Sequence, residues 1–312
     1  MAVRYDTPAA RWVIAATVLG SGMAAIDGTV VGIALPSIGR QFQASLGTLQ
    51  WVVTGYTLTL AALLILGGSL GDRYGRRRVF EVGVVWFTAS SVACALAPNS
   101  TALVLTRILQ GVGAALLTPG SLAIIQASFE RADRGRAVGA WSGLGGVATA
   151  TGPLVGGYLI AAASWRWIFV INVPVGVLVL ALSVRHVPES RDPGAPRRVD
   201  LLGGALAVVA LGGITFGIIE GPARGWADAI VVAMLAVGVL GAAGFVAVER
   251  SSPAPMMPLG IFGVRQFTAT NVVTFLVYAA LGGTLFLLPV ELQVVDHYTR
   301  SNRAWPFCPS RC

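Results

Sequence analysis

Asp27 and Arg107 stand inside stretches of the sequence that otherwise hold apolar and small residues. A charge within a bilayer costs about 2.5 to 3.5 kcal/mol on insertion scales, so each side chain needs a partner or water. A neighbouring cation favours the ionised form of a carboxyl group, whereas desolvation favours the protonated form. We therefore predict that Asp27 carries a proton whose binding Arg107 tunes; a static ion pair that locks two helices is the alternative.

A second concentration of charge is the segment GSLGDRYGRRRVF, residues 68–80, which separates two apolar stretches. A basic anchor at one membrane face would explain its four arginines. It would explain neither Asp72 nor the regularly placed Gly68, Gly71 and Gly75. The segment therefore predicts a built turn with a function of its own.

Glycine and proline gather in a third segment, TATGPLVGGYL, which lies in another apolar stretch. Proline removes a helix hydrogen bond and glycine removes side-chain bulk, so this helix must bend or admit close neighbours. A small-residue packing face is the alternative, and it explains Gly152 and Gly156 without needing Pro153. Gly157 completes the cluster.

Composition and the length of the apolar blocks require membrane helices. Of 312 residues, 55% are hydrophobic and 12% are charged, against about 25% charged in soluble domains. Blocks of about 20 residues suit helices that rise ~1.5 Å per residue across ~30 Å of hydrocarbon, and they lack the alternating polarity of a barrel wall. We predict an all-α polytopic membrane protein. Nine helices are expected, at 12–35, 49–71, 79–97, 101–124, 137–162, 167–184, 200–220, 227–247 and 267–290.

The arginines predict the orientation, because short arginine-rich loops stay in the cytoplasm. A cytoplasmic amino terminus leaves only Arg40, Arg166 and Arg224 in the outer loops, and we expect a multi-pass protein of the plasma membrane. Counted from the expected helix ends, Asp27 and Arg107 lie ~12 Å and ~9 Å below the outer surface. We expect the two to meet.

Several function classes lack the residues that they need. The net charge of +8 comes from loop arginines without interleaved aromatic residues, which argues against nucleic acid. Residues 67–71 match the G-x-S-x-G pattern of hydrolases, but the only histidines, His186 and His297, lie in a linker and the tail. The three cysteines have no metal-site spacing and no P-loop lysine occurs. We expect no enzyme, cofactor or metal, and a gradient as the energy source; the oligomeric state is unknown.

Five segments, in order, resemble the major facilitator superfamily. They are IDGTVVGIALPSI, GSLGDRYGRRR, LTRILQGVGAA, ATATGPLVGG and SWRWIFVINVPVG. The second is similar to the loop between helices two and three of that family, and the fourth to its fifth-helix antiporter motif, except that Ala148 replaces the first glycine. Together they resemble the fourteen-helix drug:proton antiporters, which are multidrug efflux exporters.

The resemblance implies a proton-coupled exporter of amphipathic, often cationic, small molecules, with partners that are its substrate, protons and the lipid bilayer. It implies proton coupling by Asp27 and Arg107. The implied cytoplasmic gate is Gly68, Asp72, Arg73, Gly75, Arg76 and Arg77. The implied antiporter motif is Gly152, Pro153, Gly156 and Gly157. Trp51, Tyr56, Gln110 and Asn172 are expected along the substrate path.

The resemblance also implies a domain plan. It comprises a six-helix bundle (1–184), a cytoplasmic linker (185–199), an inserted helix pair (200–250), the start of a second bundle (251–295) and a polar tail (296–312). The family continues toward a further helix where the tail begins, so we predict a carrier truncated at its carboxyl end by a frameshift or early stop. Alternating access requires two bundles that rock against each other. A truncated chain that is inactive as a transporter is therefore one of the expected outcomes. The alternative is a non-transporting remnant or assembly partner that requires a second chain.

Overall fold

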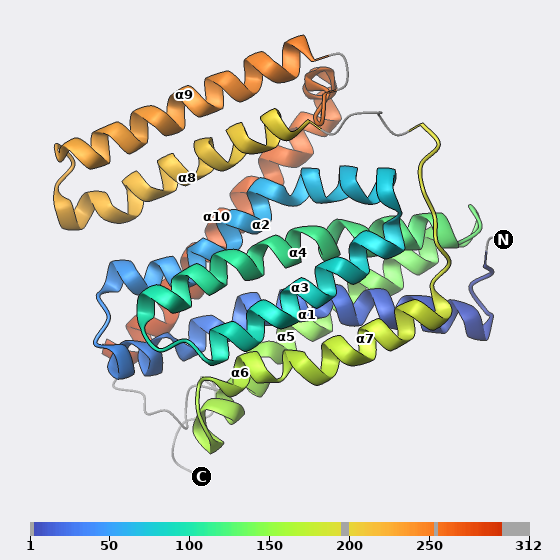
Figure 1. Ribbon diagram of the computed structural model, residues 1–312, viewed down its shortest axis with the longest axis horizontal. Helices are drawn as coiled ribbons and strands as arrows, with labels where there is room; N and C mark the ends of the chain where they lie inside the picture. The colour runs from blue at the N-terminus through green and yellow to red at the C-terminus, as the bar shows by residue number, and fades with distance from the viewer. Residues whose placement is uncertain (1–2, 195–199, 253–254, 295–312) are drawn as a thin grey trace. The chain divides into compact units, whose positions relative to one another are not determined.

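The computed structural model describes residues 3–194, 200–252 and 255–294 (Figure 1). Among these residues the regular elements are helices, which confirms the all-α prediction, and one isolated backbone bridge pairs Val3 with Phe129. The helices are α1 (Pro8–Phe42), α2 (Leu46–Tyr74), α3 (Arg76–Ala95), α4 (Ser100–Ser128), α5 (Arg134–Ala162), α6 (Trp167–Val170), α7 (Asn172–His186), α8 (Leu201–Arg224), α9 (Ala229–Ser251), the 3₁₀ helix η1 (Leu259–Gly263) and α10 (Arg265–Val294).

The chain divides into two compact units, residues 1–256 and 257–312. The first unit takes in the six-helix bundle, the linker and the inserted helix pair together. The described part of the second unit holds η1 and α10.

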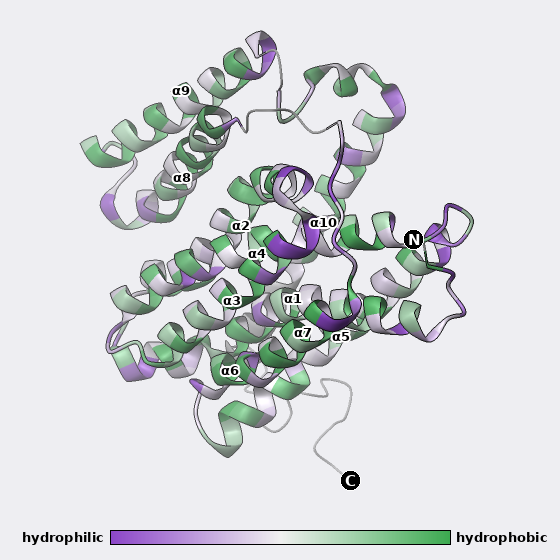
Figure 2. Cartoon of the chain, turned by 45° about the vertical axis from the view of Figure 1, so that its right-hand side comes forward, coloured by the Kyte–Doolittle hydropathy of each residue, from purple (hydrophilic) through white to green (hydrophobic). Residues whose placement is uncertain are grey.

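Eight spans in the described part of the chain are long and apolar enough to cross a membrane, with α6 and α7 counted as one span, Trp167–His186. They coincide with the first eight expected helices, and α10 covers the ninth. Hydrophobic residues run along the helices, whereas hydrophilic residues gather toward helix ends and connections (Figure 2). The protein is therefore a multi-pass membrane protein.

Most expected helix ends lie within four residues of those in the structure, but two helices depart further. The first helix does not end at Leu35 but continues through Pro36 to Phe42, where Gln43 takes a left-handed conformation (φ 48°) and closes it. The sixth span is not one helix, because Ile171 separates α6 from α7. Pro174 accounts for that break, since it has no N–H with which to continue the hydrogen-bond ladder back to α6.

Side-chain oxygens begin most of the long helices. Thr7, Ser45, Asn99, Asp200 and Asp228 each accept a backbone N–H in the first turn of α1, α2, α4, α8 and α9. Such caps satisfy N–H groups that have no partner within the helix. α3 is different, because the residue before it is Gly75, which offers no capping side chain.

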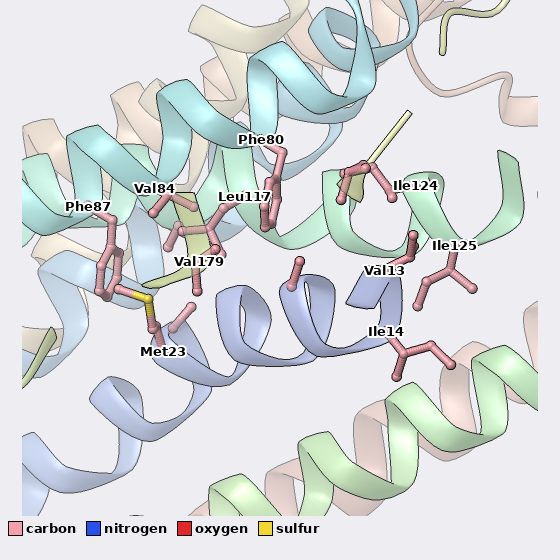
Figure 3. Packing of buried hydrophobic residues seen from close by; sticks show 14 of the residues in the cluster. Val13, Ile14, Met23, Phe80, Val84, Phe87, Leu117, Ile124, Ile125 and Val179 are labelled. Atoms are coloured by element: carbon pink, nitrogen blue, oxygen red, sulfur yellow. The ribbon is translucent and has the colours of Figure 1, made fainter. Parts of the chain in front are cut away.

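The main apolar core lies between α1, α3 and α4, and α7 closes one side of it. Figure 3 shows Phe80 and Phe87 of α3, Leu117 of α4, Met23 of α1 and Val179 of α7 pointing toward one another. All five side chains are buried. This packing holds α1 and α4 side by side, which places Asp27 and Arg107 within reach of each other.

Candidate functional site

The buried centre of the first unit is an ion pair between two helices. Arg107 Nη1 of α4 donates a hydrogen bond to Asp27 Oδ2 of α1, and neither side chain has any exposed surface. The expected contact is confirmed. The expected depth of Asp27 rested on a wrong helix end, because α1 extends to Phe42, but helix packing brings the two groups together regardless of where each helix ends.

Two amides add to the carboxylate of Asp27. Gln110 Nε2 lies 3.0 Å from Asp27 Oδ1, and Asn172 Nδ2 of α7 lies 3.5 Å from the same oxygen. Gln110 Oε1 also accepts from Arg107 Nη1 at 2.8 Å. Arg107 and Gln110 are one helical turn apart, so α4 presents a cation and an amide to the same acid.

α3 supplies two members of this network that the sequence analysis missed. Ser91 Oγ accepts hydrogen bonds from Gln110 (3.2 Å) and Asn172 (2.9 Å), and it donates to the carbonyl oxygen of Phe169. The Cys94 thiol donates to Gln110 Oε1 at 3.5 Å. Small polar residues are common where membrane helices pack closely, so nothing in the sequence marked Ser91 or Cys94 as part of a site.

α2 holds the guanidinium of Arg107 from the other side. Arg107 Nε donates to the carbonyl oxygen of Val52 at 3.0 Å, and the Tyr56 ring centroid lies 4.3 Å from Arg107 Cζ. The Tyr56 hydroxyl in turn donates to the carbonyl oxygen of Ala24 at 2.9 Å. A cation over an aromatic face is stabilised by the ring quadrupole, so contacts from α2 hold Arg107 in position.

The site surrounds one buried acid and one buried base with polar partners from four helices. Arg107, Gln110 and Asn172 donate to the Asp27 carboxylate, and the Gln110 side chain and the Val52 carbonyl oxygen accept from Arg107. Within the described ranges no three His, Cys, Asp or Glu side chains gather as a metal site.

A sequence profile described as Major Facilitator Superfamily matches residues 17–309. This chain belongs to the Major Facilitator Superfamily. Two curated relatives are multidrug resistance protein Stp of Mycobacterium tuberculosis, 41% identical over 92% of this chain and 53% of Stp, and the tetracenomycin C resistance and export protein of Streptomyces glaucescens, 38% identical over 90% of this chain and 52% of that protein. The chain spans about half the length of these relatives.

A solved structure supports the fold. The chain matches the peptide transporter POT in complex with sulfate with a TM-score of 0.58, at 16% identity, over 81% of this chain and 55% of that one. At this identity the likeness concerns the helical arrangement alone. It agrees with the superfamily assignment from the sequence.

The junction between α2 and α3 holds the residues expected to form a gate. It is shorter than the expected loop, because Asp72 and Arg73 end α2, Arg76 and Arg77 begin α3, and only Gly75 separates the helices. Asp72 Oδ1 accepts from Arg76 Nε at 2.8 Å, and Arg73 lies over the ring of Tyr74. The side chain of Asp72 stays 38% exposed and that of Arg76 is 19% exposed, so this acid and base lie at the surface of the unit.

Glu189, which the sequence analysis left in the linker, caps α3. Its carboxylate oxygens each accept a backbone N–H, from Arg77 and from Arg78, both at 3.2 Å. Gly75 makes this approach possible, because its φ is +118° and a Cβ there would lie 2.7 Å from Glu189 Oε1. The sequence carried a signal for this contact, because the acid Glu189 follows the sixth expected helix and the arginine-rich segment 73–78 follows the second.

Backbone bonds extend this contact along the linker. The Arg76 N–H donates to the Ser190 carbonyl oxygen at 2.9 Å, and the Asp192 N–H donates to the Asp72 carbonyl oxygen at 3.0 Å. Residues 187–192 of the predicted linker (185–199) are therefore bound to residues 72–78 at the α2–α3 junction.

The glycine-rich segment of α5 faces α1 with two of its members. A Cβ at Gly152 would lie 2.4 Å from Thr29 Oγ1, and one at Gly156 would lie 2.5 Å from Val30 Cγ1. Pro153 is exposed, and a Cβ at Gly157 would meet nothing within 4 Å. Close packing against α1 thus accounts for Gly152 and Gly156. An export-favouring role for the motif stays a prediction.

The four residues expected along a substrate path fall in two places. Tyr56, Gln110 and Asn172 are buried around the ion pair. Trp51 lies apart from them, with its indole nitrogen 3.1 Å from Glu220 Oε1 of α8. Their role along a substrate path stays a prediction.

Proposed function

We propose that this chain acts as a proton-coupled secondary transporter that exports amphipathic small molecules by alternating access. The observation that carries the proposal is the sealed Asp27–Arg107 pair within a membrane-spanning chain of this superfamily. An ionisable group in the membrane is expensive and usually functional. The relatives include a multidrug resistance protein and a tetracenomycin C resistance and export protein, which supports export of a drug-like small molecule.

In this proposal the Asp27 carboxyl group binds and releases the coupled proton. Arg107, Gln110 and Asn172 donate to the carboxylate, so any movement of α4 or α7 away from α1 withdraws donors and favours protonation. Protonation in turn removes the charge that attracts Arg107. Helix movement and proton binding would then drive each other.

In this proposal the protein lies in the plasma membrane. The arginine distribution supports a cytoplasmic position for the amino terminus and for the α2–α3 junction. Asp72, Arg73, Arg76 and Arg77 would form the cytoplasmic gate, with Gly68 and Gly75 shaping its backbone. Glu189 supports this assignment because it accepts from the backbone N–H of Arg77, while the Asp72 side chain stays 38% exposed.

The test is transport by this chain in vesicles, with a fluorescent amphipathic cation as the probe. We expect Asp27→Asn to abolish accumulation driven by a pH gradient while preserving substrate counterflow, which needs no net proton movement. A purely structural Asp27 would affect both measurements equally, and that result would reject the carrier role.

Two further variants serve as controls for this test. Asp27→Glu retains an acid and should retain driven transport with a shifted pH dependence, which separates loss of the proton carrier from loss of folding. Asp6→Asn removes a different carboxylate, one that is 80% exposed and pairs with Arg136 at 3.7 Å. It should leave both transport modes unchanged.

A further inference from the structure

Glu220, near the end of α8, is bound by a residue from a distant part of the chain. Trp51 of α2 donates its indole N–H to Glu220 Oε1 at 3.1 Å, and Arg224 donates to Glu220 Oε2 at 3.0 Å. The Trp51 and Phe216 rings lie 6.1 Å apart. The Glu220 side chain is only 21% exposed, so most of its surface is covered by protein rather than by water.

The contact between α8 and α2 continues along both helices. Leu66 of α2 lies 3.4 Å from the position of a Cβ on Gly204, near the opposite end of α8. Leu66 and Trp51 are four helical turns apart on α2. α8 thus follows α2 over most of its length, and the polar contact at Glu220 fixes one end of the interface.

α8 and α9 themselves form one tightly packed hairpin (Figure 1). A Cβ at Gly213 would lie 2.5 Å from the Met234 carbonyl oxygen, and one at Gly238 would lie 2.6 Å from the Ile214 nitrogen. Backbones that approach this closely leave little room for the two helices to shift. We therefore expect α8 and α9 to move together.

Trp51 precedes a residue of the buried site. The next residue, Val52, accepts the hydrogen bond from Arg107 Nε with its carbonyl oxygen at 3.0 Å. One turn of α2 therefore makes both bonds. The Trp51 side chain bonds to Glu220 of α8, and the Val52 carbonyl oxygen bonds to Arg107 of α4.

We infer that Glu220 is a positioning residue: through Trp51 it docks the inserted pair on α2 and fixes the turn of α2 that orients Arg107. The inserted pair then moves as one body with the bundle that holds Asp27. The docking depends only on the contacts above, whereas its consequence for proton coupling rests on the proposed function.

A double-mutant cycle tests the link without requiring transport. The unfolding equilibrium constant is measured for the full chain, for Glu220→Gln, for Arg107→Gln and for the double variant. Residues in one network deviate from additivity, so we expect the combined effect to differ at least about two-fold from the product of the single effects. Effects that multiply within error would overturn the inference.

The cycle has matched controls. Asp6→Asn combined with Arg107→Gln should show no coupling, because Asp6 pairs with Arg136 of α5 at the surface. Trp51→Phe keeps an aromatic ring but loses the indole N–H and should reproduce the coupling of Glu220→Gln. Trp141→Phe removes an indole N–H that bonds to Ser21 Oγ of α1 instead, and this variant should show no coupling to Arg107. Where Arg107→Gln fails to fold, Arg107→Lys replaces it in the cycle.

Distances in lipid nanodiscs give a second readout. Spin labels at exposed positions 57 on α2 and 218 on α8, with Cys308 and Cys312 replaced by serine, should show one narrow distance that Glu220→Gln broadens. A distance that is broad already in the unaltered chain would overturn the docking. Absence of efflux by the unaltered chain would count against the proposed function alone, since neither measurement uses transport.

Discussion

Two regions of the protein use an aspartate and an arginine in opposite surroundings. Asp27 and Arg107 are sealed between α1 and α4, and both side chains have no exposed surface. Asp72 and Arg76 pair at 2.7 Å across the α2–α3 junction, with 38% and 19% of their side chains exposed. The chemistry is the same, but water competes only at the second pair.

This difference predicts how much each pair matters. An exposed ion pair contributes about 0 to 1 kcal/mol, because solvent screens it and side-chain entropy opposes it. Breaking a buried pair by removing one partner costs about 3 to 5 kcal/mol, because a charge is left without compensation. Burial rather than pairing therefore sets the energetic weight of these residues.

The largest effect should follow from breaking the buried pair. Arg107→Gln leaves the Asp27 carboxylate without its cation, and we expect the free energy of unfolding to fall by about 3 to 5 kcal/mol. Denaturation of the purified protein in detergent or nanodiscs measures it. Replacing both residues by apolar ones, Asp27→Leu with Arg107→Met, should recover most of the loss. A double variant as unstable as the single one would show that the network, and not the unpaired charge, dominates.

An intermediate effect is expected at the backbone that supports the exposed pair. Gly75→Ala places a Cβ at a position with φ +118° and 2.7 Å from Glu189 Oε1, and strain of this kind costs about 1 to 3 kcal/mol. The free energy of unfolding should fall by that amount, and linker residues 187–192 should exchange their amide hydrogens faster. Gly135→Ala, at a position where a Cβ would meet nothing within 4 Å, is the control and should change neither measurement.

The smallest effect should come from the exposed pair itself. Arg76→Gln removes the contact with Asp72, and we expect less than about 1 kcal/mol, decreasing further as salt is added. Unfolding at low and high ionic strength measures it. A salt-independent loss as large as that of Arg107→Gln would contradict the comparison, because it would mean that the α2–α3 loop is shielded from water.

Composition and block length were enough to predict the helices, because blocks of about 20 apolar residues in a bilayer can satisfy their backbone only as helices. It also marked Asp27 and Arg107, since a charge stands out against an apolar background. The regular spacing of Gly68, Gly71 and Gly75 beside the charged residues was also visible in the sequence. Each of these conclusions depends on local composition, which the chain carries wherever its helices pack.

Which residues meet depends on how the helices pack. Arg107 and Asp27 are 80 positions apart, Arg77 and Glu189 are 112 apart, and Trp51 and Glu220 are 169 apart. Ser91 and Cys94 joined the network because α3 packs against α4, and Glu220 gained a partner because α8 lies along α2. Local pattern cannot specify such pairs, because the rotation and register of each helix are set by packing against its neighbours.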